Sequence, residues 1–226
     1  MATLRRVALA LLLAPTASCS FLPDPMDPKV AEVVDRSRTT NATYSLYSRS
    51  RLTLEGRAPV EEWGAEFHHG ALHRVETPTN RMVANCTDLS GTHLFLPTGE
   101  RSSEEWIAKA ACGINANKPI ASSEWLGRVD TPFGPADRVK LVDGDSIRTY
   151  DVADNGALVA GTISDLDGTM RVVNTAVELR PTVADMGIFA PSSLNRSAVP
   201  DRIKITMTAE PASIEVRRLA SGATGT

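Results

Sequence analysis

Hydrophobic and polar residues alternate along most of the chain after residue 43, as they do in strands that face a core on one side only. In residues 60–69, for example, Trp63, Ala65 and Phe67 share one parity, while acidic residues and His68 share the other. The pattern predicts short strands at residues 44–55, 60–69, 72–77, 82–87 and 93–96. Gly70 and other turn residues between them are typical of hairpins.

The second half of the chain repeats this arrangement. Three turn pairs, Asp143-Gly144, Asn155-Gly156 and Asp167-Gly168, are strong hairpin signals. They separate predicted strands at residues 138–142, 147–152, 157–163 and 170–179, which would form an up-and-down meander. A last hairpin is predicted from residues 202–208 and 213–219.

Two segments follow the period of a helix instead. The first begins where Asp27 can cap a helix and Pro28 suits its first position, and Val30, Val33 and Val34 then share one face. The second lies in the middle of the chain, where Ser102 and Glu105 have the spacing of a capping box. It carries Trp106 and Ile107 on its apolar face, and Gly113 is placed to end it. Strands with two inserted helices predict an antiparallel α+β fold, with the helices over the concave face of a curved sheet.

The N-terminus has the layout of a secretory signal. Arg5 and Arg6 precede an apolar run that is too short to span a membrane, and small residues follow it. Residues 16–18 with Cys19 resemble a bacterial lipobox, which implies cleavage after residue 18 and acylation of Cys19. Cleavage by an ordinary signal peptidase, without lipid, is the alternative. Ser20 after the cysteine implies sorting to the outer membrane, on its periplasmic side.

The remaining chain divides simply. Residues 19–28 contain three prolines and are expected to form an extended tether. Residues 29–219 are expected to form a single domain, and residues 220–226 a flexible tail. Loss of Arg5 and Arg6 with the signal lowers the net charge from −3 to −5, so nucleic acid is not an expected partner.

The three cysteines form an odd number for an exported protein. If Cys19 carries lipid, Cys86 and Cys112 remain as an even pair in an oxidising compartment, and we expect a disulfide between them. Such a bridge closes a loop of about 27 residues and would contribute roughly 3 kcal/mol. Two buried free thiols are the alternative.

The order of these elements resembles that of the periplasmic lipoprotein-carrier superfamily, the LolA/LolB-like proteins. The resemblance lies in the strands of residues 63–97, in the hairpin of residues 88–97, and in the closing meander of residues 147–191 with its Asp-Met-Gly-Ile-Phe-Ala-Pro ending. It implies an incomplete β-barrel that binds acyl chains between sheet and helices. A lipid-anchored member would resemble the receptor rather than the soluble carrier.

The resemblance leads to an expected ligand and an expected site. A hydrophobic ligand or a lipoprotein acyl chain would occupy the hollow, in lipoprotein or lipid transport, and Trp63, Phe67, Phe95 and Trp106 are the large side chains expected to line it. Each of them can instead be an ordinary core residue. The alternative function is a structural or interaction lipoprotein of the cell envelope without a small ligand.

No pattern in the sequence argues for catalysis. A nucleophile elbow and a phosphate-binding glycine loop are both absent from the sequence. His68, His69, His73 and His93 are close in sequence but lack the spacing of a zinc motif, so solvated strand histidines are expected and no metal or other cofactor is predicted.

Overall fold

The computed structural model describes residues 26–39, 41–114 and 119–208. The first half contains α1 (Pro28–Thr39), β1 (Thr43–Leu52), β2 (Val60–His69), β3 (Leu72–Glu76), β4 (Asn80–Asn85), β5 (Ser90–Phe95), β6 (Glu100–Ser102) and α2 (Glu105–Ala111). The second half contains β7 (Ser122–Thr131), β8 (Gly134–Val142), β9 (Ser146–Ala153), β10 (Leu158–Asp165), β11 (Met170–Arg180), the 3-10 helices η1 (Met186–Phe189) and η2 (Pro191–Asn195), and α3 (Asp201–Thr208).

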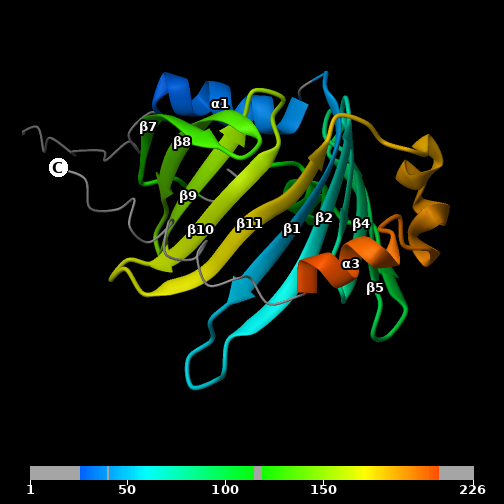
Figure 1. The fold of residues 1–226 in the computed structure, drawn as a ribbon. Helices are drawn as coiled ribbons and strands as arrows, with labels where there is room; N and C mark the ends of the chain where they lie inside the picture. Colours follow the sequence, from blue (N-terminus) through cyan, green and yellow to red (C-terminus); the bar gives the residue numbers. More distant parts are fainter. Residues whose placement is uncertain (1–25, 40, 115–118, 209–226) are drawn as a thin grey trace, which may run out of the picture.

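All eleven strands belong to one antiparallel sheet, in the order β6-β5-β4-β3-β2-β1-β11-β10-β9-β8-β7 (Figure 1). The first and last strands of the order do not meet, so the sheet is open. Neighbouring strands are consecutive in the chain except where β1 pairs with β11. The predicted α+β fold, with its two meanders, is therefore confirmed.

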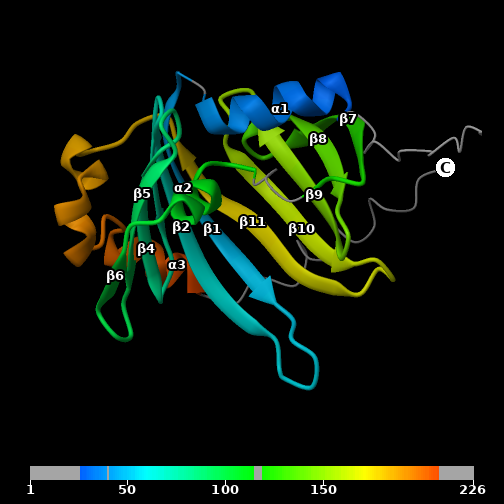
Figure 2. The ribbon, with the colours of Figure 1, turned by 180° about the vertical axis from the view of Figure 1, so that it is seen from behind.

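The sheet curves towards the face that carries Tyr44 and Leu46. These side chains of β1 belong to a buried cluster that continues along the sheet through Ala176 of β11 and Val159 of β10. Cross-strand pairing places Tyr44, His68 and Ala84 on this concave face, and Ala84 packs against α2. Through the other half of the sheet the same face packs against α1, whose Val30, Val33 and Val34 are buried there. Both helices lie over the concave face, as predicted (Figure 2).

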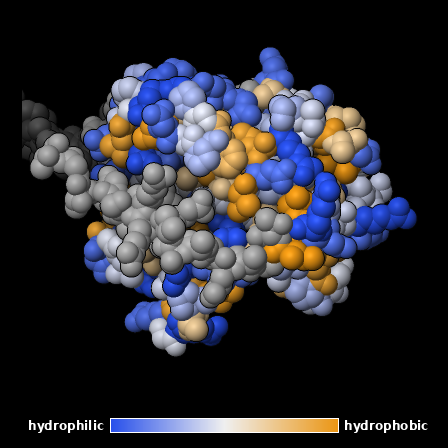
Figure 3. All heavy atoms as spheres, viewed as in Figure 1, coloured by the Kyte–Doolittle hydropathy of each residue, from blue (hydrophilic) through white to orange (hydrophobic). Residues whose placement is uncertain are grey.

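The opposite, convex face is covered over β1–β5 by the chain after β11. There α3 contacts β1 and β2, η1 contacts β3, and η2 contacts β4 and β5. The surface on this side carries small apolar patches divided by polar residues (Figure 3).

The helix α3 corrects the prediction of a final hairpin. Ile203, Ile205 and Met207 alternate as they would in a strand, but only Ile203 and Met207 are buried, and Ile205 is 69% exposed. Residues i and i+4 share one face of a helix, so the two buried side chains are placed on the sheet by helical spacing. Residues 213–219 of the predicted hairpin lie outside the described residues.

The ends of the first two helices differ in how well they were predicted. Asp27 caps α1, because its Oδ1 accepts a hydrogen bond of 2.7 Å from the backbone N–H of Lys29. The predicted capping box of Ser102 and Glu105 at the start of α2 is wrong. Ser102 belongs to β6, where it pairs with His93, and α2 begins only after Glu104, whose side chain makes no capping bond.

Gly113 joins the end of α2 to α1. Its φ of +61° is in the left-handed region, and a Cβ at this position would lie 2.4 Å from the carbonyl oxygen of Ser37. The next residue, Ile114, donates its backbone N–H to Ser37 Oγ at 3.0 Å. A glycine is therefore required where the two helices meet.

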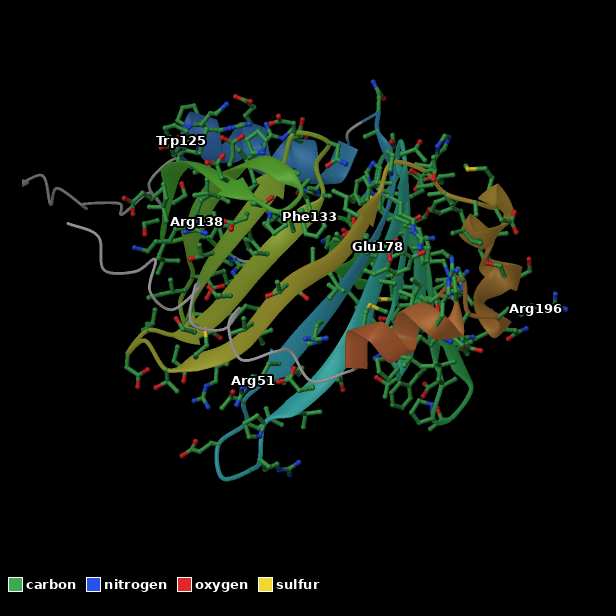
Figure 4. The ribbon with its side chains drawn as sticks, viewed as in Figure 1. Arg51, Trp125, Phe133, Arg138, Glu178 and Arg196 are labelled. Atoms are coloured by element: carbon green, nitrogen blue, oxygen red, sulfur yellow. A yellow bond between two sulfur atoms is a disulfide. The ribbon has the colours of Figure 1, made fainter. Side chains whose placement is uncertain are left out.

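The two edges of the sheet are unlike its interior. At one edge, β6 has only three residues. At the other edge, β7 is bent by a bulge between Trp125 and Gly127, whose φ is +101°, and most of its residues are exposed. Trp125 lies beside α1 and donates a hydrogen bond of 3.1 Å to the buried carboxylate of Asp137 (Figure 4).

Candidate functional site

The four residues predicted to line a hydrophobic cavity are divided between the two faces of the sheet. Phe67 is buried on the convex face in a cluster with Ile203 and Met207 of α3, and Trp63 packs against the same cluster. Phe95 and Trp106 lie on the concave side, where both rings contact the ring of His93. Two of the four are thus brought together near α2, and the other two form part of the contact with α3.

The group on the concave side is called the α2 aromatic patch here and consists of His93, Phe95 and Trp106. The ring of His93 is 5.7 Å from that of Trp106 and 6.5 Å from that of Phe95, and His93 Nε2 is 2.8 Å from Asn80 Oδ1. Trp106 is nevertheless 48% exposed. A large aromatic ring that is positioned by neighbours but uncovered is a suitable contact for an apolar partner.

A disulfide holds the helix that carries this patch. Cys86, just after β4, and Cys112, at the end of α2, are bonded, with their Cα atoms 5.7 Å apart. Both cysteines are buried beside Ala84, Ala108 and Ala111. The bridge predicted from the cysteine count is therefore present, and it fastens α2 to the sheet.

A second group, unlike the predicted solvated histidines, is buried on the concave face near the end of α1. His68 of β2 and His73 of β3 are directly paired and wholly buried, and their ring centroids lie 4.1 Å apart. Tyr44 stacks on His68 at 4.8 Å and donates a hydrogen bond of 2.7 Å to Glu66 Oε1. The expectation of solvated histidines is wrong for these two, because the turn at Gly70 directs both rings under α1.

The charges of this group affect one another. Burial raises the pKa of Glu66, but the proximity and charge of His73, the hydroxyl of Tyr44 and the charge of His68 outweigh it, and the net pKa is lowered. Burial, and then the charge and hydrogen bond of Glu66, raise the pKa of Tyr44 well above its ordinary value. Glu66 is therefore a carboxylate at neutral pH, and Tyr44 keeps its proton.

The other two histidines have separate environments. His69 is exposed on the convex face, where its Nδ1 is 2.7 Å from Thr43 Oγ1. His93 belongs to the α2 aromatic patch. Neither contributes to the buried group.

A cavity of about 580 Å³ lies on the convex side, between Arg74 and the chain of η1 and η2. Its lining is mostly polar and includes Asp185, Ser193, Asn195 and Arg196. Arg196 projects away from the molecule (Figure 4). Arg74 itself is buried and already bonded to several partners, so this cavity offers little to an acyl chain.

Cys19 lies outside the described residues. Among the helices that are described, none is long and apolar enough to cross a membrane.

Proteins similar to this chain are found by fold and not by sequence. No family model and no curated protein matches the chain. Similar solved structures include an uncharacterised conserved protein from Thermus thermophilus (12% identity, TM-score 0.48, 75% of this chain and 92% of that chain). MucB (10%, 0.46, 76% and 64%) and a LolA superfamily protein from Nitrosomonas europaea (9%, 0.42, 74% and 98%) are also similar. The protein from Nitrosomonas europaea carries the family name that the sequence resemblance indicated. These three TM-scores are below 0.5, so function is inferred below from this chain's own residues.

Glu66, His68, His73 and Tyr44 were not predicted as a group. The pairing of the two histidines could have been predicted from the sequence, because a two-residue turn at residues 70–71 makes His69 face Leu72 and His68 face His73. The contribution of Tyr44 depends on the pairing of β1 with β2, which the local pattern does not fix.

Proposed function

We propose that the protein is a lipid-anchored periplasmic protein that uses the α2 aromatic patch to bind a hydrophobic ligand or a lipoprotein acyl chain. The observation that carries the proposal is the exposure of Trp106, which remains 48% exposed although His93 and the disulfide-bound helix hold it in place. Phe95 extends the same apolar surface. The site is smaller than the cavity of four residues that the sequence predicts.

The physical reason is the burial of apolar area at a site that is already formed. Each methylene of an acyl chain that leaves water contributes about 0.8 kcal/mol. Because the disulfide fixes α2 on the sheet before a ligand arrives, little ordering of the site opposes binding. Two methylenes covered by the indole of Trp106 would therefore change affinity by roughly tenfold.

The test is binding of a fluorescent long-chain fatty acid to the mature, exported chain and to two variants. Trp106→Asp places a charge in the α2 aromatic patch and is expected to weaken binding at least tenfold. Met186→Asp is the matched control, because Met186 is 45% exposed but lies on η1, on the other side of the sheet. Its affinity is expected to equal that of the wild type.

Equal affinities of the wild type and Trp106→Asp would contradict the site. If the wild type binds no fatty acid at all, the interaction lipoprotein becomes the better account, with the same patch as a protein contact.

The anchor is tested separately. In the proposal, Cys19 carries the lipid and holds the protein at the periplasmic side of the outer membrane, where it takes part in lipoprotein or lipid transport. Cys19→Ala is expected to move the protein from the membrane fraction to the soluble periplasmic fraction. Unchanged retention in the membrane would contradict the anchor, without affecting the fatty-acid experiment.

A further inference from the structure

We propose that Glu66, His68 and His73 form a binding site for a divalent transition-metal ion of the Zn²⁺ class. One carboxylate oxygen and one nitrogen from each imidazole lie within 4.8 Å of one another. All three residues are on the concave face, and the two histidines face each other directly across β2 and β3. This inference goes beyond the proposed function and differs from the absence of a metal expected from the sequence.

The hydrogen bond of His73 fixes which of its nitrogens can bind a metal. Its Nε2 is 3.1 Å from the carbonyl oxygen of Arg38, which can only accept, so Nε2 carries the hydrogen. Metal binding requires the neutral form of the ring, and in that form the lone pair is on Nδ1, which lies 3.5 Å from Glu66 Oε1. Metal-binding histidines commonly donate their second nitrogen to a carbonyl in this way.

The contact of His73 Nδ1 with Glu66 Oε1, at 3.5 Å, is too long for a good hydrogen bond. The residue is wholly buried, and Nδ1 makes no well-formed hydrogen bond to any described residue. A buried polar atom without a hydrogen bond is costly. A bound cation would satisfy this atom and the Glu66 carboxylate together.

Tyr44 would orient the Glu66 carboxylate, and the exposure of Glu66 would give the ion access from solvent. Tyr44 donates its hydroxyl hydrogen to Glu66 Oε1, which leaves Oε2 of the same carboxylate for other contacts. The Glu66 side chain is 15% exposed, so the group has contact with solvent. Three protein ligands with such access leave a fourth position for water or for a group from a ligand.

The chemistry of the donors favours zinc. Two imidazoles and one carboxylate suit Zn²⁺ rather than Ca²⁺ or Mg²⁺, which prefer oxygen ligands. Metal–ligand distances of about 2.0–2.2 Å require the donor atoms to move together by roughly 1 Å, which small side-chain rotations supply.

The test is metal binding by the full exported chain without a histidine tag, after chelator treatment and dialysis. Elemental analysis is expected to find one Zn²⁺ per chain, and Co²⁺ is expected to give the visible absorption of a four-coordinate site. Zn²⁺ should raise the melting temperature. His68→Ala is expected to lower affinity at least 100-fold, and Tyr44→Phe, which removes only the hydroxyl, by about 10–100-fold.

The chain has four histidines, so the double variant His69→Ala/His93→Ala changes every histidine outside the proposed site. It is expected to bind Zn²⁺ as the wild type does. A wild type without stoichiometric Zn²⁺, or equal losses in this double variant and in Tyr44→Phe, would overturn the proposal. If His68→Ala does not fold, Tyr44→Phe and the effect of Zn²⁺ on wild-type melting decide the question.

Discussion

Replacing Arg74 by Met removes a buried guanidinium that connects β3 to the segment covering the convex face. Arg74 Nε donates to Glu76 Oε1 at 2.7 Å, and its terminal nitrogens donate to the carbonyl oxygens of Ile188 and Arg196 at 2.6 Å and to Ser193 Oγ at 2.7 Å. Met has a similar length and fills much of the space. The change therefore tests the charge and the hydrogen bonds more than the packing.

The expected cost follows from what remains in the variant. Glu76 is wholly buried and would lose its closest cation, while the backbone N–H of Ala198 and Ser197 Oγ would still donate to it. Removing one member of a buried ion pair costs about 3–5 kcal/mol. Because Glu76 keeps these two donors and a longer ion pair with Arg81, at 3.5 Å, we expect a loss at the lower end of this range, about 3 kcal/mol, in the free energy of unfolding.

The assay is urea unfolding at neutral pH, followed by circular dichroism and tryptophan fluorescence. Arg101→Met is the matched control, because Arg101 also joins a strand to this segment, through Pro191 and Asn195, but is exposed. Its cost is expected to stay below about 1 kcal/mol. Adding Glu76→Gln to Arg74→Met removes the buried charge that has lost its closest cation and should restore part of the lost stability. Equal costs for Arg74→Met and Arg101→Met would refute the reasoning.

Three further changes have defined outcomes. Cys86→Ala/Cys112→Ala opens a loop spanning 26 positions and should cost about 3–4 kcal/mol in urea unfolding, a loss that vanishes when both proteins are compared under reductant. Burial raises the pKa of Asp137, but the hydrogen bonds and charges of Arg36, Trp125 and Arg128 outweigh burial, and the net pKa is lowered. The ionised Asp137 therefore stabilises the fold at pH values above the unfolded pKa of about 3.9, and this stabilisation is lost as the pH falls through the folded pKa. Asp137→Asn should therefore cost about 2 kcal/mol at pH 7 and progressively less in unfolding at acidic pH; a pH-independent difference would contradict this. Gly113→Ala should lower the free energy of unfolding by more than about 2 kcal/mol, because the added Cβ would collide with Ser37. Gly99→Ala is the control, because Gly99 also has a positive φ but has open space around it, so its substitution should bring almost no packing penalty. Thermal melting of the two variants measures the difference.

The meanders were predictable because their strands carry period-two patterns and end in glycine turns. The strands between Asp143 and Arg180 agree with the prediction to within a few residues. α3 was not predictable in this way, because Ile203, Ile205 and Met207 fit a strand as well as a helix. Its register is decided by a cluster on β1 and β2 that is far away in sequence.

The same distinction applies to the sites. The disulfide was predicted from the number of cysteines and the expectation that the chain is exported. Trp63 and Phe67 lie on the opposite face of the sheet from Phe95 and Trp106. Which alternate residues of each strand face α2 is fixed by the pairing of the whole sheet, and the local pattern does not contain this information. The buried group at His73 likewise needs three strands and the end of α1 in their final positions.

The open sheet has a consequence for how copies of this protein can meet. An unpaired edge offers backbone hydrogen bonds to any other extended chain and is a common route to aggregation. Here β6 is too short for such pairing, and β7 is twisted by its bulge and carries Glu124, Arg128 and Asp130. At high local density, strand addition between copies is thereby disfavoured. Assembly with any partner is expected to proceed through side chains on the faces of the molecule, and not through a shared sheet.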